Sequence, residues 1–439
     1  MSAKYESDLP GGQQERQLLV QSPRLGARRW FGPRLLMLVG PGLMVMLADT
    51  DAGSITTAAQ SGAQFGYQLV LPQLVLIPIL FVVQEMTVRL GLVTGRGHGA
   101  LIREMFGTRW ALLSAVTLFV SCFGALITEF AGLAGVGALI GLPRVVSIGV
   151  PAVALIALVL AGRYRRIEVV GVTIGALELL FIPVALLAHP DLGALADGLG
   201  HPLVLTAPYL TLLAANVGAV IMPWMVFYQQ GAVIDKGSRG LTLRAALRSA
   251  RLDTAIGAVV TQVVMVAVVI AVAATIGTRD PGADLGGIGS IADALTPFLG
   301  RTAAVVLFGL GMLGAAVIAI LVVTLAGAWG MAEVLGWRHS LNDSPRRAKG
   351  FYSLAVAATL TGATLVILWP NLVALSVDVE VMNACLLPIV LGFLLLLERR
   401  ALPPELRLHG TRQATTYTLT GIVIAFGLYT TITTLLGHT

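Results

Sequence analysis

The chain of 439 residues has little charge and little histidine. Asp, Glu, Lys and Arg make up only 12% of it, and its six histidines are scattered through loops and termini. No His-Glu-x-x-His sequence occurs, which excludes the common zinc-protease arrangement. No Gly-rich phosphate-binding loop ending in Lys-Ser/Thr occurs either, which excludes transport driven by ATP within this chain. We therefore expect neither an enzyme nor a bound cofactor.

Other signals are also missing. The two cysteines, Cys122 and Cys385, lie within apolar segments, where cysteine usually behaves as a small buried hydrophobe. Basic residues are not interleaved with aromatic ones, so no nucleic-acid partner is expected. The first thirty residues lack the apolar core and small-residue cleavage site of a signal peptide. Residues 1–33 are predicted to form a cytoplasmic tail.

What the chain has in abundance is apolar sequence. It is 56% hydrophobic with a mean hydropathy of +0.86 and 50 glycines, a composition typical of a polytopic membrane protein. About 20 apolar residues are needed to cross the hydrocarbon of a bilayer. Eleven segments meet that length and predict an all-α fold: 34–58, 67–93, 111–141, 144–162, 167–188, 209–234, 252–276, 303–335, 351–369, 371–397 and 416–436.

The loops give an independent test of this count, because cytoplasmic loops carry most Lys and Arg. With the N-terminus inside, alternate loops collect nearly all basic residues, and Arg144, Arg279 and Arg301 are left on the outer side. The C-terminus is then predicted outside. This pattern fits an integral protein of a bacterial inner membrane and explains the net charge of +6 through contact with anionic lipid. The sequence makes no prediction about oligomeric state.

Two of the predicted spans are interrupted. The first carries Asp49 and Asp51 just before Gly53 and Ser54, and the sixth meets Pro223 in its middle. A charge at the bilayer centre costs about 2.5 kcal/mol or more, so such residues usually face a partner or a water-filled path. Proline and glycine permit unwound backbone that exposes carbonyl oxygens at membrane depth.

Breaks in the first and sixth spans match the expectation for an inverted five-plus-five repeat with its binding site at the midplane. The prediction is one transporter domain, 34–439. It contains repeat one over about 34–188, repeat two over about 209–397, and an extra helix over 416–436.

Specific motifs surround both breaks. Asp51-Ala52-Gly53-Ser54 is followed by the Ser61 to Tyr67 run SGAQFGY and the Arg89 to Gly95 run RLGLVTG, and the second break reads Gly218-Ala-Val-Ile-Met-Pro223. In order and spacing these motifs resemble the natural resistance-associated macrophage protein (Nramp) family of divalent metal transporters. The resemblance extends from about Arg34 to the C-terminus.

The resemblance implies a set of metal ligands. Asp51 would supply a carboxylate oxygen, Met222 a thioether sulfur and Ala219 a backbone carbonyl. Ser54 stands where the family has asparagine, so a hydroxyl or a bound water would replace an amide oxygen. The chemistry agrees with this set, because carboxylate and carbonyl oxygens suit Mn²⁺ or Mg²⁺ while a thioether favours softer transition metals.

The proton-carrying residues of the family are largely replaced. Trp224 and Gln229 stand at the positions of its two sixth-helix histidines, and of its paired acidic positions in the third span only Glu129 remains, beside Gly132. Histidine is the side chain that titrates most readily near neutral pH. Symport with H⁺ is therefore left open, with Glu129 and Gln229 as candidate residues of a path.

Several other polar residues lie within predicted spans. Leu386 replaces the family's tenth-span glutamine, and the nearby Glu380 and Asn383 are candidates to supply oxygen instead. Asp49 is read either as a supporting carboxylate of the metal site or as a cap at the helix break. Glu178 is an isolated charge deep in the fifth span, and such charges are usually functional.

Two further expectations concern the inner side. Glu85 and Arg89, four residues apart, are expected to form an ion pair on one helix. Asp253 stands at the start of the seventh predicted span and is expected to cap that helix.

The sequence thus predicts a secondary or facilitative transporter of a divalent cation, Mn²⁺ or Fe²⁺ first, working by alternating access. An Mg²⁺ transporter of an Nramp-related branch is one alternative. A sodium-coupled symporter of an organic solute is another, since it shares the broken-helix architecture. Asp51 would, however, repel the carboxylate of an amino-acid substrate.

Overall fold

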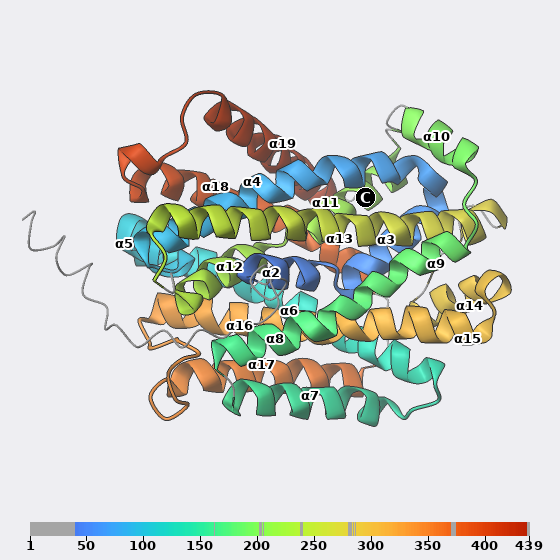
Figure 1. The fold of residues 1–439 in the computed structure, drawn as a ribbon, viewed down its shortest axis with the longest axis horizontal. Helices are drawn as coiled ribbons and strands as arrows, with labels where there is room; N and C mark the ends of the chain where they lie inside the picture. Colours follow the sequence, from blue (N-terminus) through green and yellow to red (C-terminus); the bar gives the residue numbers. More distant parts are fainter. Residues whose placement is uncertain are drawn as a thin grey trace, which may run out of the picture. The chain divides into compact units, whose positions relative to one another are not determined.

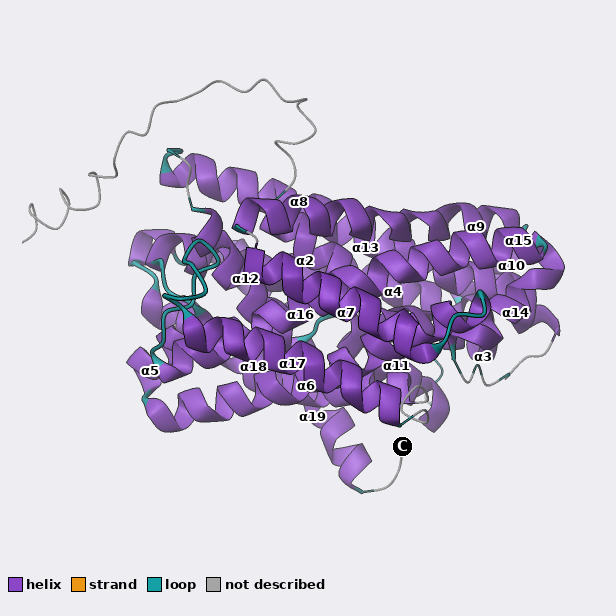
Figure 2. Ribbon diagram, turned by 90° about the horizontal axis from the view of Figure 1, so that it is seen from below, coloured by secondary structure: helices purple, strands orange, loops and turns teal. Residues whose placement is uncertain are grey.

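The computed structural model describes residues 40–436, apart from 162, 202–203, 205, 238–239, 280–282, 284, 286 and 370–374. The predicted tail, residues 1–33, and the start of the first predicted span lie outside the described residues. The described part of the chain is built from helices and contains no strand (Figure 2). This confirms the all-α fold class.

The helices follow the predicted spans, and most boundaries are shifted by a few residues, although α13 begins at Leu243 instead of 252 and α3 ends at Phe65 instead of 58. They are α2 Pro41–Asp49, α3 Ala52–Phe65, η2 Gly66–Leu69, α4 Val70–Thr94, α5 His98–Phe106, α6 Thr108–Leu139, α7 Arg144–Ala161, α8 Tyr164–Gly175, η3 Ala176–Leu180, α9 Phe181–Leu187, α10 Leu192–Gly200, α11 Ala207–Val220, α12 Pro223–Lys236, α13 Leu243–Arg279, α14 Ile288–Leu299, α15 Arg301–Ala303, η4 Ala304–Phe308, α16 Gly309–Leu335, α17 Lys349–Leu368, α18 Ser376–Ala401, η6 Pro404–Leu406 and α19 Gly410–Leu435.

Ten helical stretches of the described chain are long and apolar enough to cross a membrane. The first of them, Ala52–Thr94, has 43 residues and would be about 65 Å long as one straight helix, roughly twice the thickness of bilayer hydrocarbon. It turns back at Gly66, whose positive φ of 56° interrupts the α-helix between α3 and α4 (Figure 1). Because this stretch crosses twice, the ten stretches correspond to eleven spans, the predicted number.

The broken helices lie at the centre of the bundle. Helices α2, α3, α11 and α12 are buried along most of their length, and α13 packs against α2, α3 and α4. Helices α7 and α17 pack together at one edge, and α19 lies at the opposite edge against α18 (Figure 1). The short helices α10 and α14 lie at one end of the bundle and α5 at the other. The break residues are thus enclosed by protein.

The expectation for Asp253 is wrong. Asp253 lies inside α13, and its carboxylate oxygens accept hydrogen bonds from the N–H groups of Gly42 at 2.8 Å and Leu43 at 3.2 Å. It therefore caps α2 from a neighbouring helix. The first N–H groups of a helix have no partner within that helix, and a carboxylate there also interacts favourably with the helix dipole. Gly40 and Gly42 permit this approach, since a Cβ on either would collide with Asp253.

The predicted ion pair between Glu85 and Arg89 is confirmed, and it is part of a larger group. Glu85 also accepts from Arg251 of α13 at 2.6 Å, and Arg89 lies 3.6 Å from Glu398 of α18. Arg89, Glu85 and Glu398 are nearly fully buried. Buried charges persist only when paired, so these contacts tie α4, α13 and α18 together.

The histidine of α5 is fully buried at the end of the bundle. Nδ1 of His98 lies 3.3 Å from Oε1 of Gln230, and its ring packs edge-on against Phe227 with centroids 4.8 Å apart. Burial disfavours the charged imidazolium and lowers the pKa of His98 from 6.5 to about 4. Folding therefore holds this side chain neutral where the unfolded chain would bind a proton.

This burial predicts a pH dependence of stability. Between about pH 6.5 and pH 4 the unfolded state binds the His98 proton and the folded state does not, so the folded state loses up to about 3 kcal/mol as pH falls through this window. In His98→Gln the loss of folding stability that comes from protonation of His98 should vanish. Melting temperatures of the purified protein across this pH range test it, with His201→Gln, at an exposed position, as control. Identical pH profiles for His98→Gln and the parent would contradict the assignment.

Candidate functional site

The first break is held open by its own aspartate. Asp51 has an extended backbone at the N-cap of α3, and its Oδ1 accepts the N–H of Ser54 at 2.7 Å. This is the usual role of an N-cap carboxylate. The second oxygen, Oδ2, is buried and has no hydrogen-bond partner among the described residues. Asp51 thus caps a helix and keeps one carboxyl oxygen free.

The second break follows from Pro223. Helix α11 ends at Val220, Ile221 and Met222 are non-helical, and α12 begins at Pro223. In a continuous helix the carbonyl of Ala219 would accept the N–H four residues later, but that residue is Pro223, which has none. The sequence therefore leaves the Ala219 carbonyl without its normal donor, at a fully buried position.

A single side chain joins the two breaks. The hydroxyl of Ser54 donates a hydrogen bond to the Ala219 carbonyl oxygen at 3.1 Å. Ser54 and Ala219, which the family resemblance implies as ligands, therefore contact each other directly. The serine oxygen keeps lone pairs that can accept or coordinate while its proton is directed to Ala219.

Met222 lies at the N-cap of α12 and is fully buried. The indole N–H of Trp224 donates to its sulfur at 3.0 Å. Trp224 thus orients the thioether on which the proposed selectivity depends. The sequence offered a signal for this contact, since Trp224 replaces a polar family residue two positions after the methionine.

Glu129 approaches the first break from α6. Both of its carboxylate oxygens accept the N–H of Ala52, at 3.2 and 3.1 Å, and Thr128 donates to Oε1 at 3.3 Å. Glu129 therefore satisfies a second free N–H at the start of α3. Gly132 allows α6 to come close to the break, because a Cβ there would lie 2.6 Å from that of Ala52.

Glu380 and Asn383 reach the same region from α18. The Asn383 amide donates to Oε2 of Glu380 at 3.0 Å, and Ser121 donates to the Asn383 amide oxygen at 2.8 Å. Oε1 of Glu380 has no partner among the described residues and lies so close to Gly53 that a Cβ there would collide with it. The structure thus brings Glu380 to the first break, whereas the amide oxygen of Asn383 accepts the hydrogen bond from Ser121.

The remaining two candidates are Asp49, at the end of α2, and Gln229, in the middle of α12. Asp49 is the last residue of α2, is 1% exposed, and has an unpartnered Oδ1. Gln229 is two turns beyond Met222 on α12, and its amide donates to Thr254 of α13 at 2.9 Å. Asp49 therefore borders the break, whereas Gln229 is engaged with a neighbouring helix.

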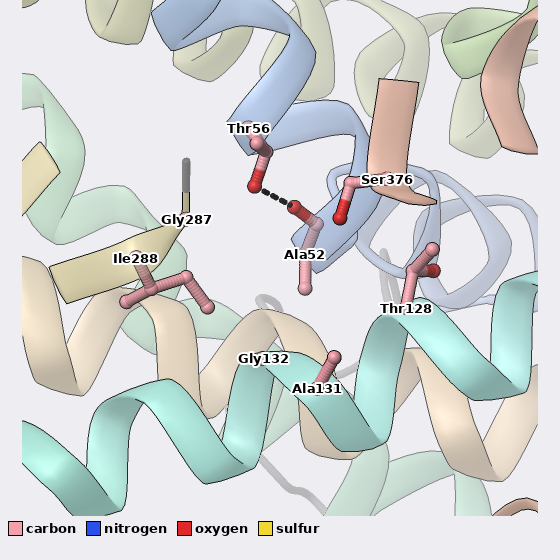
Figure 3. A pocket seen from close by; sticks show the side chains of 8 residues that line it. All are labelled: Ala52, Thr56, Thr128, Ala131, Gly132, Gly287, Ile288 and Ser376. Atoms are coloured by element: carbon pink, nitrogen blue, oxygen red, sulfur yellow. Dashed lines mark hydrogen bonds between the residues drawn. The ribbon is translucent and has the colours of Figure 1, made fainter. Parts of the chain in front are cut away.

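A narrow pocket adjoins the first break. It is lined by residues of α3, α6 and α18 and of the start of α14, and its polar side chains are hydroxyls (Figure 3): Ala52, Thr56, Thr128, Ala131, Gly132, Gly287, Ile288 and Ser376. Thr56 donates to the Ala52 carbonyl at 2.8 Å. Sequence reasoning missed Thr128, Ser121 and this pocket, because short polar residues inside an apolar segment carry no distinctive spacing.

The arrangement suits a small cation that is held by mixed ligands. Within the described residues no three His, Cys, Asp or Glu side chains form a metal cage by themselves. The facing breaks instead present a free carboxylate oxygen, a backbone carbonyl and a thioether. All of these residues are buried, with Asp51, Ser54, Ala219 and Met222 each 0% exposed. The described conformation is thus closed around the breaks.

Comparison with known sequences supports the resemblance. The family model described as natural resistance-associated macrophage protein-like (Nramp) matches residues 42–433. The divalent metal cation transporter MntH of Aeromonas hydrophila is 27% identical over 398 residues, which covers 90% of this chain and 95% of that protein. MntH of Acidiphilium cryptum is 29% identical over 343 residues, or 74% of this chain and 76% of its own length.

Solved structures show the same fold. A variant of the Eremococcus coleocola manganese transporter superposes with a TM-score of 0.74 at 21% identity and covers 94% of this chain and 90% of its own. MhsT in complex with L-phenylalanine gives a TM-score of 0.59 at 14% identity and covers 94% of this chain and all of its own. The eleven-span architecture with two broken helices is therefore confirmed.

The contact between α11 and α18 yields a prediction. A Cβ at Gly218 would collide with the carbonyl oxygen of Glu380, so Gly218→Ala must push α18 away from the second break. Overpacking of this kind costs about 1–3 kcal/mol, and we expect a lower melting temperature. Gly392→Ala on α18 is the matched control, since no atom lies within 4 Å of its Cβ position. Equal effects of the two substitutions would contradict the close-contact argument.

Proposed function

The chain belongs to the natural resistance-associated macrophage protein-like (Nramp) family, and from this premise we propose that it carries a divalent transition-metal cation across the membrane by alternating access. Mn²⁺ or Fe²⁺ is the proposed cargo. The observation that carries the proposal is the hydrogen bond from Ser54 to the Ala219 carbonyl, because it brings the free oxygen of Asp51 and the sulfur of Met222 to facing helix breaks.

The ligand chemistry supports a transition metal over Mg²⁺ or Ca²⁺. Hard cations prefer an all-oxygen shell, and Mg²⁺ in particular loses its waters reluctantly. A thioether is a soft ligand that contributes to Mn²⁺ or Fe²⁺ binding and little to Mg²⁺. Asp51, Ala219 and Met222 would hold the cation, and Ser54 would contribute its hydroxyl oxygen or a water in place of the family's amide.

Charge supports the proposal as well. Asp51, Glu129 and Glu380 reach the first break from three different helices, and Asp51 and Glu380 each have an oxygen without a partner. Like charges buried together are costly unless a cation or protons neutralise them. A dication between the breaks would supply that compensation.

The closed conformation bears on the organic-solute alternative. MhsT, solved with L-phenylalanine, shares the fold, so the fold alone does not separate a metal from an amino acid. Here one hydroxyl bridges the two breaks at 3.1 Å, and the unpartnered Asp51 oxygen beside it suits a cation better than a substrate carboxylate. This contact favours the metal. The Mg²⁺ alternative is distinguished by the role of Met222.

The bacterial relatives named MntH support an inner-membrane location, with the N-terminus cytoplasmic as the basic loops predict. Transport would then proceed as α2 and α12 move away from the bundle on one side and α3 and α11 on the other. The capping of α2 by Asp253 would stabilise the closed state on the predicted inner side.

The role of Asp51 is tested by Asp51→Asn, which keeps the size of the side chain and removes the charge. We expect radiotracer Mn²⁺ uptake into proteoliposomes to fall by more than about 100-fold, since even outer-shell partners of metal ligands contribute about 10–100-fold. Asp378→Asn, an exposed carboxylate on α18, should leave uptake unchanged. Uptake by Asp51→Asn at the parent rate would rule out this ligand.

The role of Met222 is tested by selectivity. In Met222→Ala the thioether is lost and the oxygen ligands remain, so Mn²⁺ should bind more weakly while Mg²⁺ and Ca²⁺ compete better. We expect the ratio of apparent affinities for Mn²⁺ over Mg²⁺ to fall by about tenfold, equivalent to about 1.4 kcal/mol. Competition assays with the exposed Met105→Ala as control measure it. An unchanged ratio would instead support packing as the role of Met222 and leave Mg²⁺ open as cargo.

A further inference from the structure

Glu178 is a buried acid that the proposed metal site does not use. It lies in η3, the short 3-10 stretch between α8 and α9, and is 0% exposed. Neither of its carboxylate oxygens has a hydrogen-bond partner among the described residues. An ionisable residue at this depth without a partner calls for a physical explanation.

The backbone segment that carries Glu178 packs closely against two neighbouring helices. At Gly175, one turn earlier, a Cβ would lie 3.2 Å from that of Leu47 on α2. On α16, a Cβ at Gly314 would lie 2.7 Å from Leu177 and 3.5 Å from the backbone nitrogen of Glu178. The segment is thus pressed between α2 and α16, and the glycine on α16 permits the approach.

This packing decides what Glu178 can bind. An ionised carboxylate without a partner costs several kcal/mol or more in such surroundings, so the group must be neutral in the closed conformation. A metal cation needs several oxygen ligands, whereas the side chains that pack against this segment from α2 and α16, Leu47 and Ile318, carry none. A proton needs one oxygen only. The geometry therefore favours a proton over Na⁺.

The carboxylates whose charge acts on Glu178 lie at the first break. Asp49 and Asp51 both act on it electrostatically. Helix α16 has no charged residue from Gly309 to Ala332, and α13, which packs on α9, has none from Thr254 to Gly277. The electrostatic field at Glu178 is thus set by the same carboxylates that border the proposed metal site.

We propose that Glu178 is a proton-binding residue of the transport cycle and that its proton is released when the metal binds at Asp51. This inference rests on the proposed metal transport. The positive charge of the bound metal stabilises a nearby carboxylate, so the carboxylic acid of Glu178 dissociates into a carboxylate and one proton, which passes to the water that enters as the helices open. Glu178 would then provide the coupling for which the replaced histidines at Trp224 and Gln229 are unsuited.

Binding of Mn²⁺ to the purified protein tests the proposal. Calorimetry in buffers of different ionisation enthalpy counts the protons released for each metal bound. Glu178→Gln, a neutral side chain of the same size as the protonated acid, should bind Mn²⁺ and release about one proton fewer than the parent. Asp378→Asn is the matched control and should release the parental number. An unchanged proton count in Glu178→Gln would overturn the proposal.

Infrared spectroscopy gives a readout that does not depend on transport. The parent should show the carbonyl band of a buried protonated carboxyl group that weakens when Mn²⁺ is added, and this change should be smaller in Glu178→Gln. If the parent shows no change of this band, the proposal is overturned even if the variant fails to fold. A number of released protons that depends on the Na⁺ concentration would overturn it as well. Mn²⁺ uptake by Glu178→Gln with parental proton movement would overturn this inference alone, whereas absence of metal binding to the parent would overturn the proposed function.

Discussion

One unsatisfied carbonyl organises the centre of this protein. A backbone C=O inside a membrane cannot bond to lipid, so each one must find a donor or line a polar site. Pro223 removes the donor that the Ala219 carbonyl would have in a continuous helix, and Ser54 from the other broken helix supplies a hydroxyl instead. That contact fixes the distance between the two breaks. The spacing of the proposed ligands depends on it.

The acids around the breaks combine structure with charge. Asp51 and Glu129 satisfy the free N–H groups at the start of α3, and Asp253 does the same for α2. The N-terminus of α3, which the first break creates, and the N-terminus of α2 thus both have carboxylate caps, and such caps help to keep unwound backbone stable at membrane depth. The caps also concentrate negative charge near the free oxygen of Asp51. The proposed cation site and the stability of the break thus depend on the same residues.

Much of this could be predicted from the sequence. Hydropathy predicted the spanning segments, since each crossing needs about 20 apolar residues, and Pro223 and Gly53 marked the breaks. The helices α5, α10 and α14 were missed because they have 9 to 12 residues, too few to span a bilayer. The role of Asp253 was predicted wrongly because its partner, Gly42, is 211 residues away and only packing brings them together. The contacts of Glu380 with Gly53 and of Trp224 with Met222 likewise depend on tertiary structure and side-chain orientation.

The central claim is that both breaks contribute ligands to one metal ion. Anomalous X-ray scattering from crystals soaked in Mn²⁺ locates the ion without reference to transport. The account predicts one strong peak within bonding distance of both the Asp51 carboxylate and the Met222 sulfur, and its loss in Asp51→Asn. A peak that contacts only one of the two breaks, or that persists unchanged in Asp51→Asn, would contradict the account.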